Sequence, residues 1–489
     1  MQWACISFPR LALDDVLRQR SDGAVPLVLF EGVGSRARVC AANAAARHHG
    51  LRAGQSLTAA RALHPRVNAI EHDAAAVERC HDFLAAWAYR YSSQVCRTFP
   101  QTLLLEVRAS FRLFGGWPAL QAELRNDLVA LGFEHRIAAA PNPHAALVLA
   151  GARDGCAIED EAHLMDALGT LPVECSGLDA ACAESLQRMG LRRLRQLFAL
   201  PRAELGKRIG IQAMLHLDRL RGAVVTALDF YRPPDTFDQR IELPFNTGSH
   251  ESLLFPLRRL LRDFSAFLAG RDGGAQRFTL AFEHERGTPT EISIGLLAPE
   301  RDPELLFAIV RARLDRARLR APVCGLRLVA DELPAFTPAR RDLFDTRPQQ
   351  AVTWEALRER LHARLGEHAA HGLALHPDHR PERAWRGVQG ADPSRGTGSL
   401  RGTHPARARD TDGSVPLPPR PTWLLVRPIP LREHVTRILA GPERIESGWW
   451  DGADMRRDYY VIETASHQRA WAFRPAGEDG PFMLQGWFA

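Results

Sequence analysis

The sequence predicts an α+β protein of several domains, and three observations support this prediction. The chain has 489 residues, which suggests about three or four domains rather than one. Residues 1–335 alternate short apolar strands with amphipathic helices. Residues 376–421 are rich in Pro, Gly, Arg and polar side chains, whereas residues 422–489 are again rich in aromatic residues.

The first 170 residues predict a sheet with helices and a helical insertion at about 40–65. Strands are expected where β-branched and aromatic residues cluster, at 2–8, 26–30, 103–107 and 135–140. Helices are expected where apolar residues recur at helical spacing, at 11–20, 41–50, 55–63, 74–91, 117–131 and 143–152.

Two further patterns follow. Between 171 and 232 short helices alternate with Gly and Pro, and the spacing from Leu186 to Leu197 predicts a helix-hairpin-helix, a module that presents backbone N–H groups to phosphates. Residues 237–332 predict a β-α-β-β-α-β unit. Its strands are expected at 240–245, 276–284, 291–297 and 325–331, and its helices at 251–269 and 303–319.

The last part of the chain predicts a disordered linker followed by a small β-rich unit. Residues 376–421 have too few apolar side chains to form a core. Strands are expected at 445–450, 459–463, 469–473 and 482–488. Six aromatic residues there either form the core of this unit or bind a partner, and we expect some to do each: Trp449, Trp450, Tyr459, Tyr460, Trp471 and Trp487.

Composition limits the possible functions. The net charge of +6 is compatible with a nucleic-acid partner, and Lys207 is the only lysine, so arginine supplies nearly all positive charge. The eight cysteines include no C-x-x-C pair, so neither a zinc site nor a redox motif is predicted. No apolar run approaches the ~18 residues of a membrane span, and the N-terminus lacks a signal peptide. We therefore expect a cytoplasmic protein without membrane contact.

The segment FPQTLLLEVRASFRLFGG, residues 99–116, resembles a palm strand of the Y-family DNA polymerases. In that family an adjacent Asp and Glu hold catalytic metal, and these positions correspond to Gln101 and Thr102 here. The first metal-binding Asp of the family corresponds to Ser7. None of the three side chains is anionic, and hard divalent cations need carboxylate oxygens. We therefore expect no catalytic residue, no bound metal and no cofactor.

Three other segments resemble the same family in the same order. RHHGLR at 47–52 resembles its fingers motif, in which Arg47 would be a vestigial nucleotide-binding residue. FEHRIAAAPNPHAALVLA at 133–150 resembles a palm motif, and LPV at 171–173 resembles the entry to the thumb. The resemblance implies a palm (1–170) with a fingers insertion (about 26–72), a helix-hairpin-helix thumb (171–235), a little finger (236–335), a clamp-binding segment (336–348), a partly helical and then disordered linker (349–421) and a C-terminal partner-binding region (422–489).

The tail segment GPERIESGWWDGADMRRDYYV, residues 441–461, resembles the ImuB family of Y-family-like proteins. That resemblance implies a non-catalytic adaptor in DNA damage-induced mutagenesis and translesion synthesis. The implied partners are DNA, the sliding clamp, an ImuA-type RecA-like protein and an error-prone C-family DNA polymerase.

A short segment after the little finger resembles the bacterial clamp-binding pentapeptide Q-L-[S/D]-L-F. Asp342, Leu343 and Phe344 match it, whereas Arg340 and Arg341 replace the Gln and the first Leu. Such a peptide places Leu and Phe side chains in an apolar groove. The alternative is a chance D-L-F in a loop.

Exposed arginines are candidates for contact with the DNA backbone. We expect Arg192, Arg193 and Arg195 in the thumb and Arg311 and Arg313 in the little finger to act in this way, the alternative being a solvated helix face.

Two other functions stay open. An active but divergent Y-family polymerase would use Asp14, Asp15 or Glu106, which would have to converge within about 4 Å of shared metals. A plain DNA-binding protein would have no polymerase partners.

Overall fold

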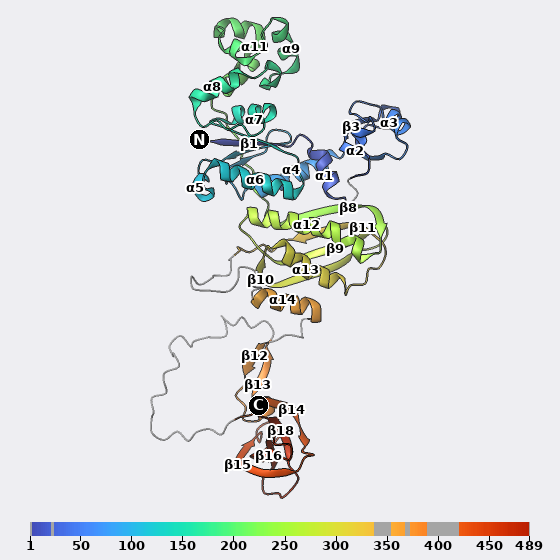
Figure 1. Ribbon diagram of the computed structural model, residues 1–489, viewed down its shortest axis with the longest axis vertical. Coiled ribbons are helices and arrows are strands. Elements are labelled where there is room, and N and C mark those ends of the chain that lie inside the picture. The colour runs from blue at the N-terminus through green and yellow to red at the C-terminus, as the bar shows by residue number, and fades with distance from the viewer. Residues whose placement is uncertain (1, 21–23, 337–353, 367–371, 389–419, 489) are drawn as a thin grey trace. The chain divides into compact units, whose positions relative to one another are not determined.

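The structure is a computed structural model that describes residues 2–20, 24–336, 354–366, 372–388 and 420–488 (Figure 1). By its internal contacts the chain forms two compact units, Met1–Arg364 and Leu365–Ala489. The predicted α+β multidomain class is confirmed, because the first unit mixes helices with sheets and the second is mainly strands. Among the helices that the structure describes, none has both the length and the apolar content that a bilayer span requires.

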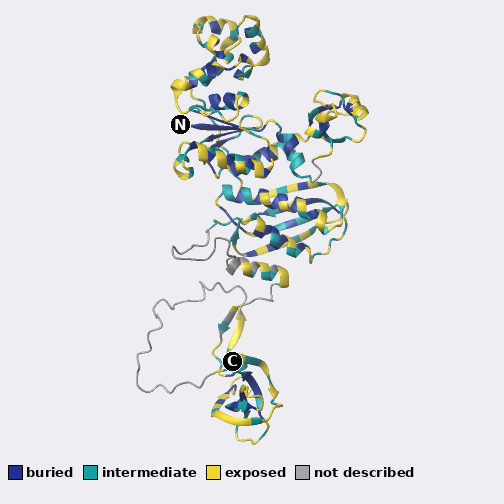
Figure 2. Ribbon diagram, viewed as in Figure 1, coloured by how far each residue is buried: buried dark blue, intermediate teal, exposed yellow. Residues whose placement is uncertain are grey.

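The palm contains a four-stranded antiparallel sheet in the order β5-β6-β1-β7. The strands are Val95–Cys96 (β5), Thr102–Glu106 (β6), Trp3–Ser7 (β1) and Arg136–Ala140 (β7). The helices are Leu11–Arg18 (α1), Ala74–Ala88 (α4), Phe111–Phe114 (α5), Trp117–Leu131 (α6) and Pro143–Ala152 (α7). Alternate β1 residues join different cores, Ile6 with α4 and α6, and Cys5 with α7. Figure 2 shows the palm strands as buried.

The fingers contain a three-stranded sheet, of which the sequence predicted one strand, at 26–30. Strands Leu27–Glu31 (β2), Arg38–Ala42 (β3) and Asn68–Glu71 (β4) form it in the order β3-β2-β4. Two helices cover it, Ala44–His48 (α2) and Leu57–Leu63 (α3). The predicted helix at 41–50 is wrong at its start, because Asn43 Oδ1 accepts hydrogen bonds from both Ala46 N (2.8 Å) and Leu27 N (3.0 Å). Asn43 thus caps α2 and holds the preceding strand against β2.

The thumb consists of short helices. They are Glu161–Gly169 (α8), Ala180–Arg188 (α9), Leu194–Phe198 (α10) and Arg202–Leu220 (α11). Gly190, with φ of 82°, turns the chain between α9 and α10, where the sequence predicts a hairpin. The buried faces of these helices share a core with α7 of the palm.

The little finger has the predicted β-α-β-β-α-β order. Its elements are Phe237–Thr247 (β8), His250–Gly270 (α12), Ala275–His284 (β9), Thr290–Glu300 (β10), Pro303–Leu314 (α13) and Val323–Ala330 (β11). The antiparallel sheet has the order β10-β9-β11-β8. α12 also packs on α4, where a Cβ at Gly270 would collide with the carbonyl oxygen of Ala86. Arg18 and Asp263 form an ion pair at 2.5 Å beside this contact.

Helix Trp354–Leu365 (α14) ends at the boundary between the two units. The second unit contains a hairpin of Gly372–Leu375 (β12) and Trp385–Val388 (β13). It also contains a five-stranded antiparallel sheet in the order β14-β18-β17-β16-β15. Those strands are Trp423–Pro430 (β14), Val435–Ser447 (β15), Met455–Thr464 (β16), Arg469–Pro475 (β17) and Met483–Trp487 (β18).

Two predictions for this region need correction. The linker was expected to begin at 376, but residues 376–388 are structured and belong to the second unit. Strand β14 was not predicted, and β15 begins ten residues before the expected start at 445. Residues 389–419 of the expected linker lie outside the described part of the chain.

Candidate functional site

The ends of two palm strands bring Ser7, Gln101 and Thr102 together. β1 and β6 pair so that Ser7 lies opposite Thr102. Gln101 immediately precedes Thr102, has φ of 51°, and accepts a hydrogen bond from Phe8 N at its carbonyl (2.9 Å). The three residues that the sequence analysis aligned with metal-binding positions are therefore neighbours at one end of the sheet.

This donor set does not fit a divalent metal. Hydroxyl and amide groups are neutral, whereas Mg²⁺ sites depend on carboxylate oxygens. A buried histidine, His81, lies here too, with Nε2 3.1 Å from the carbonyl oxygen of Thr102. Burial lowers the pKa of His81, so its ring is neutral near pH 7 and Nε2–H donates to that carbonyl. Across the described residues, His, Cys, Asp and Glu form no group of three that could hold a metal ion.

The carboxylates of α1 have structural partners. Asp14 Oδ2 accepts a hydrogen bond from Glu134 N at 2.8 Å, and burial raises the pKa of Asp14 to about 6. Asp15 accepts hydrogen bonds from Arg18 Nε and Gln19 Nε2, both at 3.3 Å. Both side chains thus have local partners within the first unit.

Glu106 lies at the other end of the strand that begins with Thr102. Its register partner is Trp3, whereas that of Thr102 is Ser7, so roughly 13 Å of strand separates the two positions. Glu106 Oε1 accepts hydrogen bonds from Gln2 N (3.1 Å) and Arg108 N (3.3 Å). This separation does not provide the shared site that the active-polymerase hypothesis requires.

The three thumb arginines lie together where α10 begins. Arg192, Arg193 and Arg195 are all exposed. Arg193 Nη1 donates to the carbonyl of Thr170 at 3.0 Å, which orients one of the three. The structure therefore presents this cluster to solvent.

The two little-finger candidates do not form such a cluster. Arg311 is exposed on α13, whereas Arg313 is half-buried. Residues two apart on a helix point about 200° apart, so the two guanidinium groups do not share one face. Only Arg311 is freely presented.

Two predicted sites remain, Arg47 and the clamp-binding segment, and the structure describes only the first. Arg47 is exposed in the last turn of α2. The predicted clamp-binding residues 340–344 lie outside the described residues.

The tail aromatics divide into core and surface. Tyr459 and Trp471 are buried and stack with ring centroids 4.2 Å apart. Trp449 and Trp450 are 78% and 55% exposed, on the turn between β15 and β16. Tyr460 and Trp487 are half-buried.

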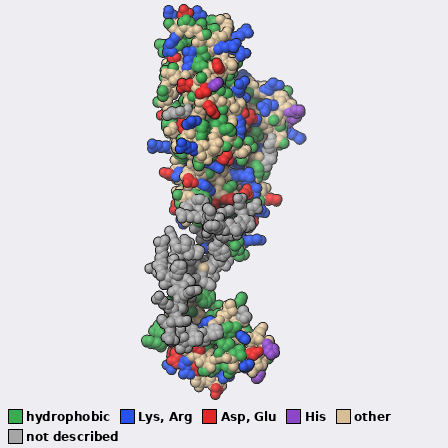
Figure 3. All heavy atoms as spheres, turned by 60° about the vertical axis from the view of Figure 1, so that its left-hand side comes forward, with side chains coloured by type: hydrophobic (Ala, Val, Ile, Leu, Met, Phe, Trp, Pro, Cys, Tyr) green, Lys and Arg blue, Asp and Glu red, His purple; other side chains and the backbone are tan. Residues whose placement is uncertain are grey.

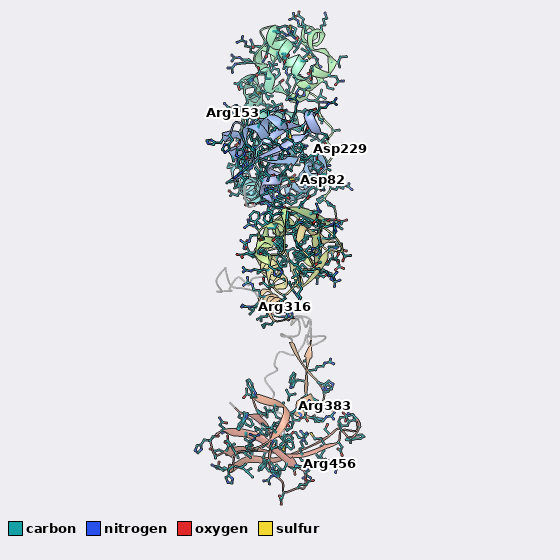
Figure 4. The ribbon with its side chains drawn as sticks, turned by 90° about the vertical axis from the view of Figure 1, so that its right-hand side faces the viewer. Asp82, Arg153, Asp229, Arg316, Arg383 and Arg456 are labelled. Atoms are coloured by element: carbon teal, nitrogen blue, oxygen red, sulfur yellow. The ribbon has the colours of Figure 1, made fainter. Side chains whose placement is uncertain are left out.

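An arginine that the sequence analysis missed anchors this tryptophan turn. Arg380, whose side chain is only 5% exposed, donates to both carboxylate oxygens of Asp451 (3.1 and 2.6 Å) and to Asp378. Hydrogen bonds from Arg380 lower the pKa of Asp378 to about 2 and also lower that of Asp451. Arg383 and Arg456, labelled in Figure 4, line a polar cavity of about 370 Å³ beside the cluster. The apolar run GLAL at 372–375, with Trp385 and Val388 after it, was the available signal for structure here.

Comparison with known proteins identifies the family. The impB/mucB/samB family model matches residues 18–151. The proteins named ImuB from two strains of Caulobacter vibrioides, NA1000 / CB15N and ATCC 19089 / CIP 103742 / CB 15, are each 32% identical to the chain over 475 residues, which cover 90% of this chain and 100% of the relative. The chain belongs to the ImuB family.

Membership of the ImuB family connects the chain with a Y-family-like role in DNA damage. Among solved structures, an insertion ternary complex of Dbh DNA polymerase matches 69% of the chain and 100% of its own, at 16% identity and a TM-score of 0.40.

Proposed function

We propose that this ImuB-family chain is a non-catalytic, Y-family polymerase-like adaptor in DNA damage-induced mutagenesis and translesion synthesis. The observation that carries the proposal is the pairing of Ser7 with Thr102, because the palm sheet is complete while its strand ends offer neutral side chains. Two-metal phosphoryl transfer needs anionic ligands at such positions. Losing several kcal/mol of transition-state stabilisation lowers a rate by orders of magnitude.

DNA is the first proposed partner. The exposed thumb arginines Arg192, Arg193 and Arg195 can bind phosphates, and we assign the same role to Arg311 and Arg313 of the little finger. Arg47 would then be a remnant of nucleotide binding.

The protein partners are proposed from the two segments that follow. Residues 340–344 would bind the sliding clamp through Leu343 and Phe344. The C-terminal region would bind an ImuA-type RecA-like protein and recruit an error-prone C-family polymerase. The exposed Trp449 and Trp450 support this, since large aromatic side chains dominate protein interfaces.

The test is a titration of purified full-length protein with the sliding clamp, with primer extension measured on the same preparation. The Leu343→Ala/Phe344→Ala variant should lose clamp binding. The Val224→Ala/Val225→Ala variant, which shortens two exposed apolar side chains of the first unit, should keep it. No variant should extend a primer. Clamp binding that survives the first substitution would refute the assigned segment, and metal-dependent extension absent from a mock preparation would refute the non-catalytic role.

A further inference from the structure

One stretch of the fingers carries positive charge with no acid among its residues. Residues 32–70 contain six arginines and no Asp, Glu or Lys. The whole chain has 63 Lys and Arg and 57 Asp and Glu, so removing these six arginines leaves 57 of each. Residues 32–70 thus carry a formal charge of +6, and thumb residues 188–208, with seven basic residues and one acid, carry the same charge.

These arginines are exposed and form no ion pair with a described residue, although Arg38 lies opposite Glu31 in the pairing of β2 with β3. They are Arg36, Arg38, Arg47, Arg52, Arg61 and Arg66. Among the described residues of the fingers, Glu31 Oε1 lies 3.1 Å from His72 Nδ1, and both of these residues lie outside the stretch. Arg38 makes one hydrogen bond, to the carbonyl of Gly54 at 3.2 Å. Figure 3 shows this lobe with blue Arg and purple His side chains at the right.

Local contacts hold this surface in shape. The rings of His49 and His64, which directly follow α2 and α3, lie 4.7 Å apart, so the C-terminal ends of the two helices meet. Gln55 orders the loop between the helices, since it donates to the carbonyl of Gly50 (3.1 Å) and accepts from Arg52 N (3.0 Å). The arginines thus project from an ordered surface.

Stability of the fingers explains only part of this charge. Arg47 and Arg61 lie in the last turns of α2 and α3, where a cation stabilises a helix by about 0.3–1 kcal/mol. Arg36, Arg52 and Arg66 lie outside both helices. Six unpaired cations close together also repel one another, which favours a polyanionic ligand.

The composition distinguishes among polyanions. Residues 32–70 contain no Phe, Trp or Tyr, so the surface lacks the aromatic anchors typical of protein interfaces. The same absence leaves histidine as the only ring type on which bases could stack. The part of a nucleic acid that this surface can bind is therefore the phosphate. The planar guanidinium group binds phosphate with two parallel hydrogen bonds.

We infer that residues 32–70 form a binding surface for the phosphate backbone of nucleic acid, without sequence preference. This inference rests on the proposed DNA-binding function and assigns an electrostatic contact to the fingers, in addition to the thumb and little-finger arginines.

The experiment is an anisotropy titration of the full-length protein with a mixed-sequence 20-nucleotide single strand and a 20-base-pair duplex at several salt concentrations. The fingers variant is Arg36→Ala/Arg52→Ala/Arg66→Ala. The matched control is Arg427→Ala/Arg432→Ala/Arg437→Ala, which removes three exposed arginines of the second unit. A third variant, Arg36→Lys/Arg52→Lys/Arg66→Lys, keeps the charge of the fingers.

We expect the fingers variant to lose about tenfold or more in affinity, and its log–log salt slope to fall by about 2–3 on duplex. The control should change by less than about twofold, and the lysine variant should keep most of the slope. Comparison of the two oligonucleotides tells which form of DNA is preferred.

Three results would overturn the assignment. Equal losses in the fingers and control variants would show that only total charge matters. Unchanged DNA binding by the fingers variant would show that residues outside 32–70 make the phosphate contact. Displacement of the oligonucleotide by poly-glutamate of equal charge would make an acidic protein the better occupant. If the unsubstituted protein bound neither oligonucleotide, the proposed DNA-binding function itself would fail.

Discussion

The fingers and the little finger both carry many arginines, but they use them differently. Residues 236–335 contain 14 arginines and 14 Asp and Glu, whereas residues 32–70 contain six arginines and no acid. On the sheet of the little finger, Arg327 pairs with Asp238 (2.5 Å) and Arg240 with Glu283 (2.7 Å). The comparison teaches that the acids beside an arginine, more than the number of arginines, decide whether it is free to bind a phosphate.

The largest expected effect concerns an arginine network that holds structure. Asp263, with a side chain 1% exposed, pairs with Arg18 (2.5 Å) and Arg259 (3.4 Å). Asp263→Ala leaves the buried guanidinium of Arg259 without its acid and that of Arg18 with Asp15 alone, so we expect the free energy of unfolding to fall by about 3–5 kcal/mol. Chemical denaturation measures it. Glu304→Ala removes an exposed acid near Arg258 and Arg262, and should cost less than about 1 kcal/mol. Equal losses in the free energy of unfolding for the two variants would show that buried and surface arginine pairs do not differ in their contribution to stability.

Asp14 extends the comparison to a buried acid that has only a long contact with an arginine. Arg10 Nε lies 3.9 Å away, and burial raises the pKa of Asp14 from 3.8 to about 6. Between these pH values the folded state binds more protons than the unfolded chain. The free energy of unfolding should therefore fall as pH rises from about 4 to about 6, by up to about 3 kcal/mol.

Asp14→Asn should remove this contribution and stabilise the protein at pH 7.5 by about 1–3 kcal/mol. Denaturation curves at a series of pH values measure both effects. Asp15→Asn, one residue along the same helix, is the control and should keep the pH dependence. A destabilised Asp14→Asn variant at pH 7.5 would show that the charged form is the one the fold requires.

The pairing argument can be tested by freeing the arginines of the little finger. Asp238→Asn/Glu283→Gln removes the acids beside Arg327 and Arg240 without removing their hydrogen-bond acceptors. We expect DNA affinity at low salt to rise by about 3- to 10-fold, because Arg327 loses the acid beside it and Arg240 keeps only Glu242, so both bind phosphates more readily. Glu285→Gln/Glu291→Gln makes the same charge change at exposed acids that form no ion pair with a described residue, and should change affinity less. An equal rise in both variants would mean that net charge, and not pairing, sets affinity.

The smallest expected effect separates surface aromatics from core aromatics. Trp449→Ala should change the free energy of unfolding by less than about 0.5 kcal/mol, because its ring is 78% exposed. Trp471→Ala, in the core of the same unit, is the contrasting variant and should cost about 3–5 kcal/mol. Thermal unfolding compares the two. A large loss from Trp449→Ala would assign this ring to the fold rather than to a partner surface.

The sequence predicted best those elements whose apolar pattern is strong and local. LLLEV at 103–107 and the two strand–helix–strand repeats of the little finger have clear periods, and both were found. RVCAA at 38–42 was missed because alanine favours helix and the strand depends on Asn43, which bonds to Leu27 across the sheet. Strand pairing of this kind overrides local propensity and cannot be seen in a short window.

The candidate site shows the same limit. Family resemblance placed Ser7, Gln101 and Thr102, and the structure brings them together because β1 and β6 pair. Arg380 was hidden in a polar, proline-containing stretch, since one of its two acidic partners, Asp451, is 71 residues away in the sequence. The fingers arginines are available to a ligand because residues 32–70 contain no acid. A search for motifs looks for residues that are present, so it does not detect such a gap.

The hairpin β12–β13 shows that residues 389–419 connect two parts of the second unit, and not the first unit with the second. β13 ends at Val388 and β14 begins at Trp423, and both belong to the second unit. The intervening stretch therefore begins and ends within the second unit, so it does not join the two units. Closing a longer loop costs only about 0.6 kcal/mol for each doubling of length. Relatives could gain or lose dozens of residues here at little cost to folding, whereas insertions between Leu365 and Gly372 would lengthen the connection between the units themselves.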